Sequence, residues 1–268
     1  MNILVTGSGA PGSRGTYFCL KSIGEINKII GIDADINKRS ISNAIFGNFA
    51  LAPKTSDEDY VSEILKICVK ENISLIIPQT TREIETLSLH KEFFLSNGIK
   101  IGVSNHDAIM NSNDKLFVTK KLNDLGFGDV RIVEVSNKDE LIKACNKFNY
   151  PELPVVIKAK NLNGKRGYRI IQQSSFNYQS FIEEKPQSDG IDLETILNTF
   201  PENFEKLMVM EYFPGEEFSV DAFIGQETEI AIPRERTSIR SGISFSNKLV
   251  KDDYLINATL QYGRSAGL

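Results

Sequence analysis

The first hundred residues alternate short apolar runs with longer amphipathic stretches. The apolar runs are rich in isoleucine, leucine and valine, which is typical of buried strands. The stretches between them repeat their apolar residues at helical spacing. Strands separated by helices predict an α/β fold, with a parallel sheet covered by helices on both faces. The predicted strands are residues 2–6, 28–33, 48–52, 74–78 and 99–104, and the predicted helices are residues 13–23, 56–70 and 82–96.

The pattern changes after a polar stretch at residues 105–113, which we expect to be a connection containing a domain boundary. Asp114 can cap a helix that ends at Gly126, and Ser136 can cap a helix over residues 139–148. Strands then become frequent, so this part is expected to be α+β. The predicted strands are residues 130–135, 155–157, 168–172, 207–212, 217–223 and 229–233, with helices at 178–184, 193–198 and 252–261 and a loop at 185–190.

Composition restricts the partners. A net charge of −4 argues against a nucleic acid held by phosphate contacts. No apolar run approaches the roughly 20 residues that cross a membrane, and MNILVTGSG lacks the basic start of a signal peptide. Cys19, Cys68 and Cys145 have no paired spacing, and His90 and His106 have no metal-ligand spacing. We expect a cytoplasmic protein with reduced thiols and a small-molecule partner.

A basic glycine loop follows the predicted strand at residues 155–157. The strand delivers Lys158 and Lys160 to its end, and the loop then contains Gly164, Lys165, Arg166 and Gly167. Glycines let backbone N–H groups approach a phosphate chain closely, and the cations neutralise it. A plain hairpin with a basic tip is the alternative.

A second strand, residues 207–212, breaks at Pro214-Gly215 and resumes at Glu217. The break frees backbone groups at Glu211, Tyr212 and Phe213 to bond a flat base, and Glu217 can accept from hydroxyl groups. An ordinary turn explains the break equally well by itself. The two runs in this order favour an ATP site over plain structure.

The first turn reads Gly7-x-Gly9-x-x-Gly12, and Asp33 ends the second predicted strand. This is the dinucleotide fingerprint in its usual context, so an NAD(P)-dependent oxidoreductase is one interpretation. The other is a glycine-rich turn that binds another ligand or only packs helix on sheet. Pro11 removes one N–H from the turn, and no redox chemistry follows downstream, which favours the second interpretation.

Two further groups have open roles. Glu83 and Glu85 lie at the predicted carboxyl edge of the sheet, where they either meet a substrate amine or, as we prefer, only favour the start of a helix. Arg234, Arg236 and Arg240 either hold an anionic substrate or the γ-phosphate, or are only solvated.

Together these stretches resemble the ATP-grasp superfamily, most closely short proteins related to the carbamoyl-phosphate synthase large subunit and to the pyrrolysine-biosynthesis ligase. The resemblance is carried by MNILVTGSGAPGS, IIGIDAD, LIIPQTTREIE, the Asn-Asp-Lys at 113–115, VVIKAKNLNGKRGYRII and MEYFPGEEFSVD. It implies a Rossmann-like pre-ATP-grasp domain at residues 1–110, which helps to form the acceptor site rather than hold NAD. It also implies an ATP-grasp amino-terminal subdomain at 111–205 and a carboxy-terminal subdomain at 206–268.

The resemblance implies roles for individual residues. Lys115 and Lys158 contact the ATP phosphates, the glycines from Gly164 to Gly167 close over them, Glu211 with the backbone of Tyr212 and Phe213 meets the adenine, and Glu217 meets the ribose. The implied chemistry is attack of a small-molecule carboxylate or amino acid on the γ-phosphate, followed by displacement of the acyl phosphate by an amine. Phosphoryl transfer needs positioning and cations more than a nucleophilic side chain.

The sequence departs from the family at the metal. The family binds Mg²⁺ through acidic residues on late strands, often in a Glu-x-Asn pattern, yet no Asp or Glu follows Asp253. We expect a shortened form of an active ligase, inactive without its metal-binding end; a nucleotide-binding protein without ligase activity is the alternative. An uncovered face there also makes a homodimer a reasonable expectation.

Overall fold

The computed structural model describes residues 1–160, 166–173, 189–225, 227–240 and 242–268, with the side chain of Arg240 outside the description. The chain forms two compact units, Met1–Met110 and Asn111–Ala266, which are described separately below. In the described residues, no helix is long and apolar enough to cross a membrane.

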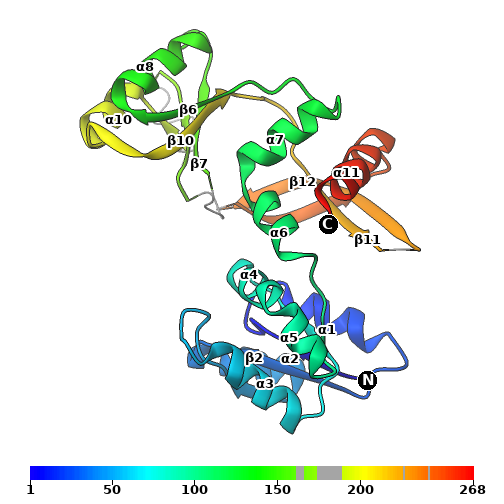
Figure 1. Cartoon of the computed structure of the whole chain (residues 1–268). Helices are drawn as coiled ribbons and strands as arrows, with labels where there is room; N and C mark the ends of the chain where they lie inside the picture. The colour runs from blue at the N-terminus through cyan, green and yellow to red at the C-terminus, as the bar shows by residue number, and fades with distance from the viewer. Residues whose placement is uncertain (161–165, 174–188, 226, 241) are drawn as a thin grey trace. The chain divides into compact units, whose positions relative to one another are not determined.

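The first unit is built on a five-stranded sheet in the order β3-β2-β1-β4-β5, with every neighbouring pair parallel (Figure 1). This confirms the predicted α/β fold. The strands are β1 (Asn2–Val5), β2 (Lys28–Asp33), β3 (Phe49–Leu51), β4 (Leu75–Ile77) and β5 (Lys100–Ile101). The helices are α1 (Ser13–Lys21), η1 (Ile36–Lys38), α2 (Arg39–Phe46), α3 (Tyr60–Lys70), α4 (Thr81–Leu89), α5 (Lys91–Ser96) and α6 (His106–Asn113), the last reaching across the division between the units.

Alternation along the strands gives this sheet two cores. Ile3 and Val5 pack with Leu20 of α1 and Phe46 of α2 on one face. The intervening Leu4 packs on the other face, in a core that α3, α4 and α5 supply with their buried side chains. A parallel sheet needs both faces covered, and the two clusters cover them.

Four features of this unit differ from the prediction. Residues 105–113 are not a plain connection, because α6 forms there and buries Ala108 and Ile109. Helix α2 was missed because its polar sequence conceals a buried stripe at Ser42 and Phe46. The helix expected at residues 56–70 begins only at Tyr60, and two successive turns precede it. The helix expected at residues 82–96 is interrupted at residue 90.

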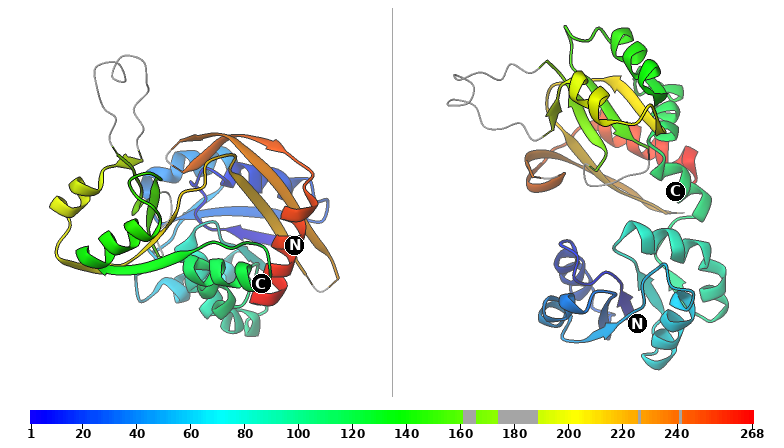
Figure 2. Two further views of the ribbon diagram at one scale, coloured as in Figure 1. Left: turned by 90° about the horizontal axis from the view of Figure 1, so that it is seen from above. Right: turned by 90° about the vertical axis from the view of Figure 1, so that its left-hand side faces the viewer.

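The second unit contains a five-stranded sheet in the order β6-β10-β7-β8-β9. Helices α8 and α10 pack on one face of it, around a core that includes Leu141, Ile157, Ile196 and Val209 (Figure 2). The strands are β6 (Ile132–Asn137), β7 (Val155–Ala159), β8 (Tyr168–Ile171), β9 (Gly190–Ile191) and β10 (Asn203–Glu211), and the helices are α7 (Lys115–Asp124), α8 (Lys138–Lys147) and α10 (Leu193–Thr199).

Helix capping in this unit follows the sequence with one change. Asp114 caps α7 as predicted, accepting from the amides of Leu116 and Phe117. Helix α8 is capped by Asn137 and not by Ser136, which instead donates to the carboxylate of Glu140. The expected helix at 178–184 lies outside the described residues, as does the 185–190 loop up to residue 188. Strand β10 lies wholly in this sheet, so the division expected at residue 205 falls within one strand.

The chain then forms a three-stranded antiparallel sheet, β11-β12-β13, against which α11 packs. Strand β12 continues well past Pro233, where the predicted strand stopped. The carbonyl of Pro233 accepts from the amide of Val250, one residue beyond the last β12–β13 pair. The N–H that proline lacks would lie on this same side, past the end of the ladder, so the proline costs the sheet no ladder hydrogen bond. The elements are β11 (Phe218–Ile224), β12 (Glu229–Arg240), β13 (Ile243–Leu249) and α11 (Asp253–Ala266).

Candidate functional site

Strand β7 and the residue after it place Lys158 and Lys160 on the face of the five-stranded sheet that is turned away from α8 and α10. Val155 and Ile157 point into the core beneath α8 and α10. Side chains alternate along a strand, so Val156, Lys158 and Lys160 stand on the opposite face. There Lys158 pairs in register with the buried Met208 of β10. The lysines therefore lie beside buried apolar side chains on this face.

The surroundings of Lys158 disfavour its charged form. Burial lowers the pKa of its ammonium group, and the nearby charge of Lys115 lowers it further, while Glu217 partly offsets both. Burial also lowers the pKa of Lys115, at the start of α7. The described part of the chain supplies Lys158 with no ion-pair partner; its ammonium lies 5.8 Å from the ring centre of Tyr168. Two neighbouring cations of lowered pKa form a site suited to an anion.

Lys160, two residues along the strand, is in a different position. Its ammonium lies 3.1 Å from Asp114 and 3.9 Å from Glu134. Burial opposes ionisation of Asp114, but the hydrogen bonds from Lys160 and from the Phe117 and Leu116 amides outweigh it, and the pKa of Asp114 is lowered. The carbonyl of Lys160 also accepts from Lys115, 3.1 Å away. Lys160 thus fastens the start of α7, and with it Lys115, to the lysine strand.

The broken strand lies close to this cluster. Glu211 still belongs to the ladder opposite Val155, and its carboxylate pairs with Arg131 at 3.1 Å. Among the described residues, none bonds to the backbone of Tyr212 or Phe213, so the free backbone begins one residue later than predicted. Burial raises the pKa of Tyr168, and the charges of Asp189, Tyr212 and Glu217 add to this effect. Tyr168, Tyr212, Glu217 and Lys158 therefore share one region of the second unit.

The arginines of β12 have carboxylate partners rather than full exposure. Arg234 makes two hydrogen bonds to Asp221, at 2.6 and 3.0 Å. Arg236 pairs with Glu217 and donates to the carbonyl of Gly242 at 2.7 Å, with only 14% of its side chain exposed. The solvated alternative is therefore wrong for Arg236. The side chain of Arg240 lies outside the described residues.

Only part of the basic glycine loop is described. Gly164 and Lys165 lie outside the described residues. Gly167 has a φ of 64°, which favours glycine, and its carbonyl accepts from the amide of Ala159 at 2.7 Å. Arg166 is exposed beside it. Gly167 thus has a backbone conformation that favours glycine, and the approach of the loop to a phosphate stays a prediction.

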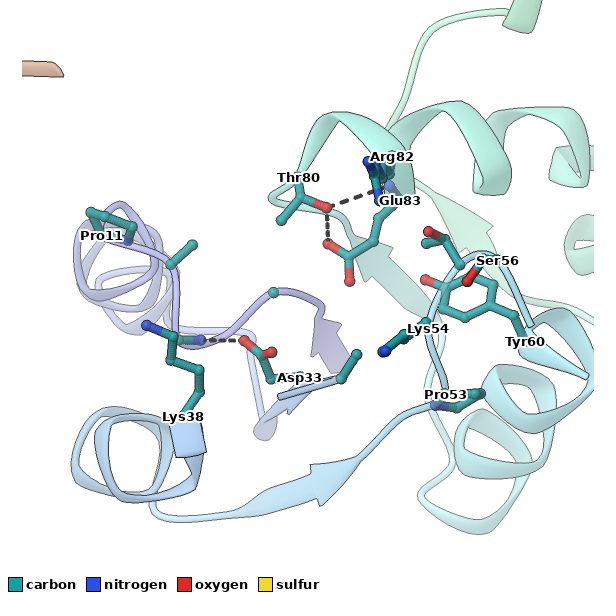
Figure 3. Close-up of a pocket in the computed structure, with 15 residues that line it drawn as sticks. Pro11, Asp33, Lys38, Pro53, Lys54, Ser56, Tyr60, Thr80, Arg82 and Glu83 are labelled. Atoms are coloured by element: carbon teal, nitrogen blue, oxygen red, sulfur yellow. Dashed lines mark hydrogen bonds between the residues drawn. The ribbon is translucent and has the colours of Figure 1, made fainter. Parts of the chain in front are cut away.

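The first unit has a separate cavity of about 430 Å³ at the carboxyl edge of its sheet (Figure 3). Four segments line it: the glycine turn after β1, the end of β2 with the residues that follow it, the turns before α3, and the start of α4. The lining residues that carry charge or a hydroxyl group are Asp33, Lys38, Lys54, Thr55, Ser56, Tyr60, Thr80, Arg82 and Glu83. Open parallel sheets bind ligands at this edge.

Asp33 is engaged within the glycine turn. Its carboxylate oxygens accept from the amide of Gly9 at 3.0 Å and from that of Asp35 at 2.9 Å. The stem of Lys38 covers Gly9 so closely that an added Cβ would lie 2.4 Å from the Cβ of Lys38. In a dinucleotide enzyme this acid would accept from a ribose. Here it orders its own turn, which supports the interpretation that the turn serves another ligand.

In the part of the chain that the structure describes, no three His, Cys, Asp or Glu side chains cluster closely enough to hold a metal ion. The described residues therefore do not by themselves form a complete magnesium site.

Two family descriptions match the sequence. "PylC-like, N-terminal domain" matches residues 3–102, and "ATP-grasp in the biosynthetic pathway with Ter operon" matches residues 203–268. No curated protein sequence matches the chain. N5-carboxyaminoimidazole synthetase from Staphylococcus aureus, solved with ADP, superposes with a TM-score of 0.66 at 16% identity, over 98% of this chain and 63% of its own.

The chain has an ATP-grasp fold. Two other solved structures agree. The biotin carboxylase domain dimer of 2-oxoglutarate carboxylase from Hydrogenobacter thermophilus, solved with MgADP, ADP and bicarbonate, has a TM-score of 0.68 at 13% identity, over 99% of this chain and 58% of its own. VanG D-Ala:D-Ser ligase from Enterococcus faecalis has a TM-score of 0.58 at 14% identity, over 99% of this chain and 82% of its own. This chain thus spans about three fifths of the length of the first two.

The predicted resemblance to the ATP-grasp superfamily and to the pyrrolysine-biosynthesis ligase is confirmed, and the resemblance to the carbamoyl-phosphate synthase large subunit stays a prediction. The fold brings several of the predicted residues together. Lys115, Lys158, Tyr212 and Glu217 lie in one region of the second unit. Sequence reasoning missed Tyr168 there and Tyr60 in the first unit. Tyr168 could have been found, because it pairs directly opposite Lys158 once the two strands form a hairpin.

Proposed function

We propose that this chain is an ATP-dependent carbon–nitrogen ligase, with ATP held in the second unit against the lysine strand. The observation that carries the proposal is the pair Lys158 and Lys115. Burial lowers the pKa of both, and the charge of Lys115 acts on Lys158. Two neighbouring ammonium groups are compensated by a polyanion, and the phosphate chain of a nucleotide is such a polyanion; a solved structure of similar fold was obtained with ADP.

Each remaining part of ATP has a candidate partner. The backbone of Tyr212 and Phe213, which no described residue engages, is available to a purine edge, beside the buried Met208 and Met210. Glu217, with about half of its side chain exposed, is available to the ribose hydroxyls alongside its pairing with Arg236. Gly167 gives the described end of the basic loop the conformation suited to close phosphate approach.

The proposed reaction proceeds in two displacements. A substrate carboxylate oxygen attacks the γ-phosphorus, a new P–O bond forms, the bond to the β-phosphate oxygen breaks, and ADP departs. An amine then attacks the acyl carbon, an amide bond forms, inorganic phosphate leaves, and the amine releases its proton. Lys115 and Lys158 stabilise charge on the phosphates, and Arg234, Arg236 and Arg240 are proposed to meet the transferred phosphate or an anionic substrate.

Magnesium is expected with ATP, since a divalent ion neutralises the charge that otherwise opposes transfer. The described residues do not form a metal site, so no step of this proposal is assigned to residues that hold the ion.

The test measures ATP binding and turnover by the chain. Saturable ATP binding that Lys158→Met abolishes supports the site. Release of ADP and phosphate that depends on an added carboxylate and amine supports the ligase. Binding without turnover is expected both of a ligase without its metal-binding end and of a nucleotide-binding protein without ligase activity, so the loss of ATP binding in Lys158→Met tests the site and carboxylate-dependent turnover tests the ligase. Stabilisation by NAD(H) and not by ATP would overturn the proposal in favour of the oxidoreductase.

A further inference from the structure

The cavity of the first unit contains a buried hydroxyl group with no partner in the described structure. Tyr60 is only 2% exposed, and its hydroxyl oxygen makes no hydrogen bond. The ring packs in the core beneath α3, while the hydroxyl points into the cavity (Figure 3). A buried polar group left without a partner costs roughly 1–3 kcal/mol. A ligand in the cavity that accepts from this hydroxyl removes that cost.

An acid enters the same cavity from the opposite side. The carboxylate of Glu83 accepts from the Thr80 hydroxyl at 2.6 Å, and no described lysine or arginine forms an ion pair with it. Burial raises the pKa of Glu83, and the charge of Asp33 adds to the effect. The same Glu83 charge, after burial, raises the pKa of Tyr60, so the two groups lie within range of each other. A cationic group in the cavity would compensate both acids.

The remaining charges are basic and lie towards solvent. Lys54 belongs to the turns before α3 and enters the cavity on the side of Tyr60 (Figure 3). Lys38 and Arg82 also line it. The cavity therefore offers carboxylates at one side and a phenol hydroxyl with an ammonium group at the other. Its volume is in the range of small-ligand sites.

We propose that this cavity binds a free α-amino acid, with its ammonium group at Glu83 and its carboxylate at the Tyr60 hydroxyl and Lys54. The arrangement is complementary to both charges of a zwitterion, and each charged end of the ligand satisfies a group that the chain leaves without an ion-pair or hydrogen-bond partner. That this amino acid serves as a substrate of the ligation rests on the proposed function; its binding does not.

The experiment is calorimetric titration of the chain with the proteinogenic L-amino acids, one at a time. The best binder is then compared with its analogue lacking the amine and its analogue with an amide in place of the carboxylate. We expect saturable binding of at least one amino acid and at least tenfold weaker binding of both analogues. Glu83→Gln should weaken binding at least tenfold and Tyr60→Phe several-fold, whereas the exposed Glu92→Gln and the distant Tyr17→Phe should leave it unchanged.

Folding is monitored separately by thermal denaturation. Tyr60→Phe removes only an unpartnered oxygen, so the ligand-free variant should melt at or above the temperature of the parent chain. ATP affinity should be the same in the parent, Glu83→Gln and Tyr60→Phe proteins, while Lys158→Met should lose ATP and keep the amino acid. Amino-acid binding without ATP binding would sink the proposed function and leave this site standing. ATP binding with no amino acid bound, or with binding indifferent to Glu83→Gln, overturns the site.

Discussion

The two units each keep a charged group where burial opposes its charge, and the signs are opposite. In the first unit the group is the carboxylate of Glu83, whose pKa burial raises. In the second it is the ammonium of Lys158, whose pKa burial and a neighbouring cation lower. A partner of opposite charge offsets the free-energy cost of burying each charge. The comparison agrees with the two proposals, an ammonium-bearing ligand in the first unit and an anion in the second.

The contrast within the lysine strand is equally informative. Lys158 and Lys160 share one face of β7, yet Lys160 has two carboxylates within 4 Å and Lys158 has none among the described residues. We therefore expect Lys160 to stabilise the chain, whereas burying the charge of Lys158 without an ion pair should lower its stability. Residue type and spacing do not distinguish these two roles; the neighbours of each ammonium group do.

Replacing Lys158 and Lys160 by methionine, one at a time, should have the largest effects on ATP binding and on stability. Lys158→Met is expected to weaken ATP binding about 100-fold, because charge-assisted hydrogen bonds contribute roughly 1.5–3 kcal/mol each. It should not lower the melting temperature of the ligand-free chain, since a desolvated charge is removed. Lys160→Met should do the reverse, lowering the free energy of unfolding by about 1 kcal/mol or more, because it leaves Asp114 and Glu134 without their cation. Isothermal titration measures the ATP affinity of both variants, and chemical denaturation measures their free energy of unfolding. If both substitutions change these two quantities equally, Lys158 and Lys160 do not have different roles.

In the first unit, Gly7→Ala should be the more disruptive of two matched alanine substitutions. Gly7 has a φ of 55°, and an added Cβ would lie 2.8 Å from Thr80 Cγ2 and 3.0 Å from Glu83 Oε2. We expect a loss of about 1–3 kcal/mol in the free energy of unfolding and weaker amino-acid binding, with ATP affinity unchanged. Gly15→Ala is the control, because nothing lies within 4 Å of its Cβ and alanine favours helix α1 by about 1 kcal/mol. Denaturation curves for both variants should move in opposite directions.

Raising the pH into the alkaline range should weaken ATP binding, by less than the substitutions above. ATP binding needs the ammonium form of Lys158, so it is complete below the pKa in the folded state and declines as pH rises through it. Because that pKa is lowered, the decline begins at a lower pH than for an ordinary lysine, and it approaches tenfold per pH unit. Stability of the ligand-free chain moves the other way: between the folded and unfolded pKa values the unfolded chain binds more protons, so the free energy of unfolding rises with pH.

Lys115→Met provides the control for this pH dependence. It removes a charge that lowers the pKa of Lys158, so the decline in ATP binding should shift to higher pH even though the affinity itself falls. Titrations of ATP across the alkaline range, in parent and variant, measure the shift. A decline at the same pH in both proteins would mean that the charge of Lys115 does not lower the pKa of Lys158.

The sequence predicted most strands of the two five-stranded sheets, where an apolar run is also a buried run, but it missed the two-residue β9 and the exposed β13 (Ile243–Leu249). The lysine strand is an example: Val155, Val156 and Ile157 are apolar on both faces and buried on both. Helix α2 was missed because it has only eight residues and polar residues, Arg39, Ser40, Ser42 and Asn43, interrupt its apolar ones. Single-residue signals such as caps were right where the side chain had one choice, as at Asp114, and wrong where Ser136 and Asn137 competed.

The candidate sites were less predictable, because spacing says which residues are near in the chain and not what already occupies them. Lys158, Lys160, Arg234 and Arg236 all look like phosphate ligands in the sequence. Only the structure supplies the carboxylates that engage the last three. Tyr60 gave no signal at all, because a tyrosine at the start of an amphipathic helix is ordinary until its hydroxyl is found buried without a partner.

The arginine pairs of β12 should give the smallest effects, and they test whether a paired cation can still serve a ligand. Asp221→Asn removes the partner of Arg234, but 64% of the Asp221 side chain is exposed, so stability should fall by less than about 1 kcal/mol. If Arg234 meets the transferred phosphate, freeing it should strengthen ATP binding two- to threefold (roughly 0.5 kcal/mol). Arg234→Lys, which retains the charge and loses the two-pronged contact, should leave ATP affinity near that of the parent chain. An ATP affinity unchanged by Asp221→Asn would assign Arg234 to the sheet, so that the anion-binding role of the second unit falls to its lysines.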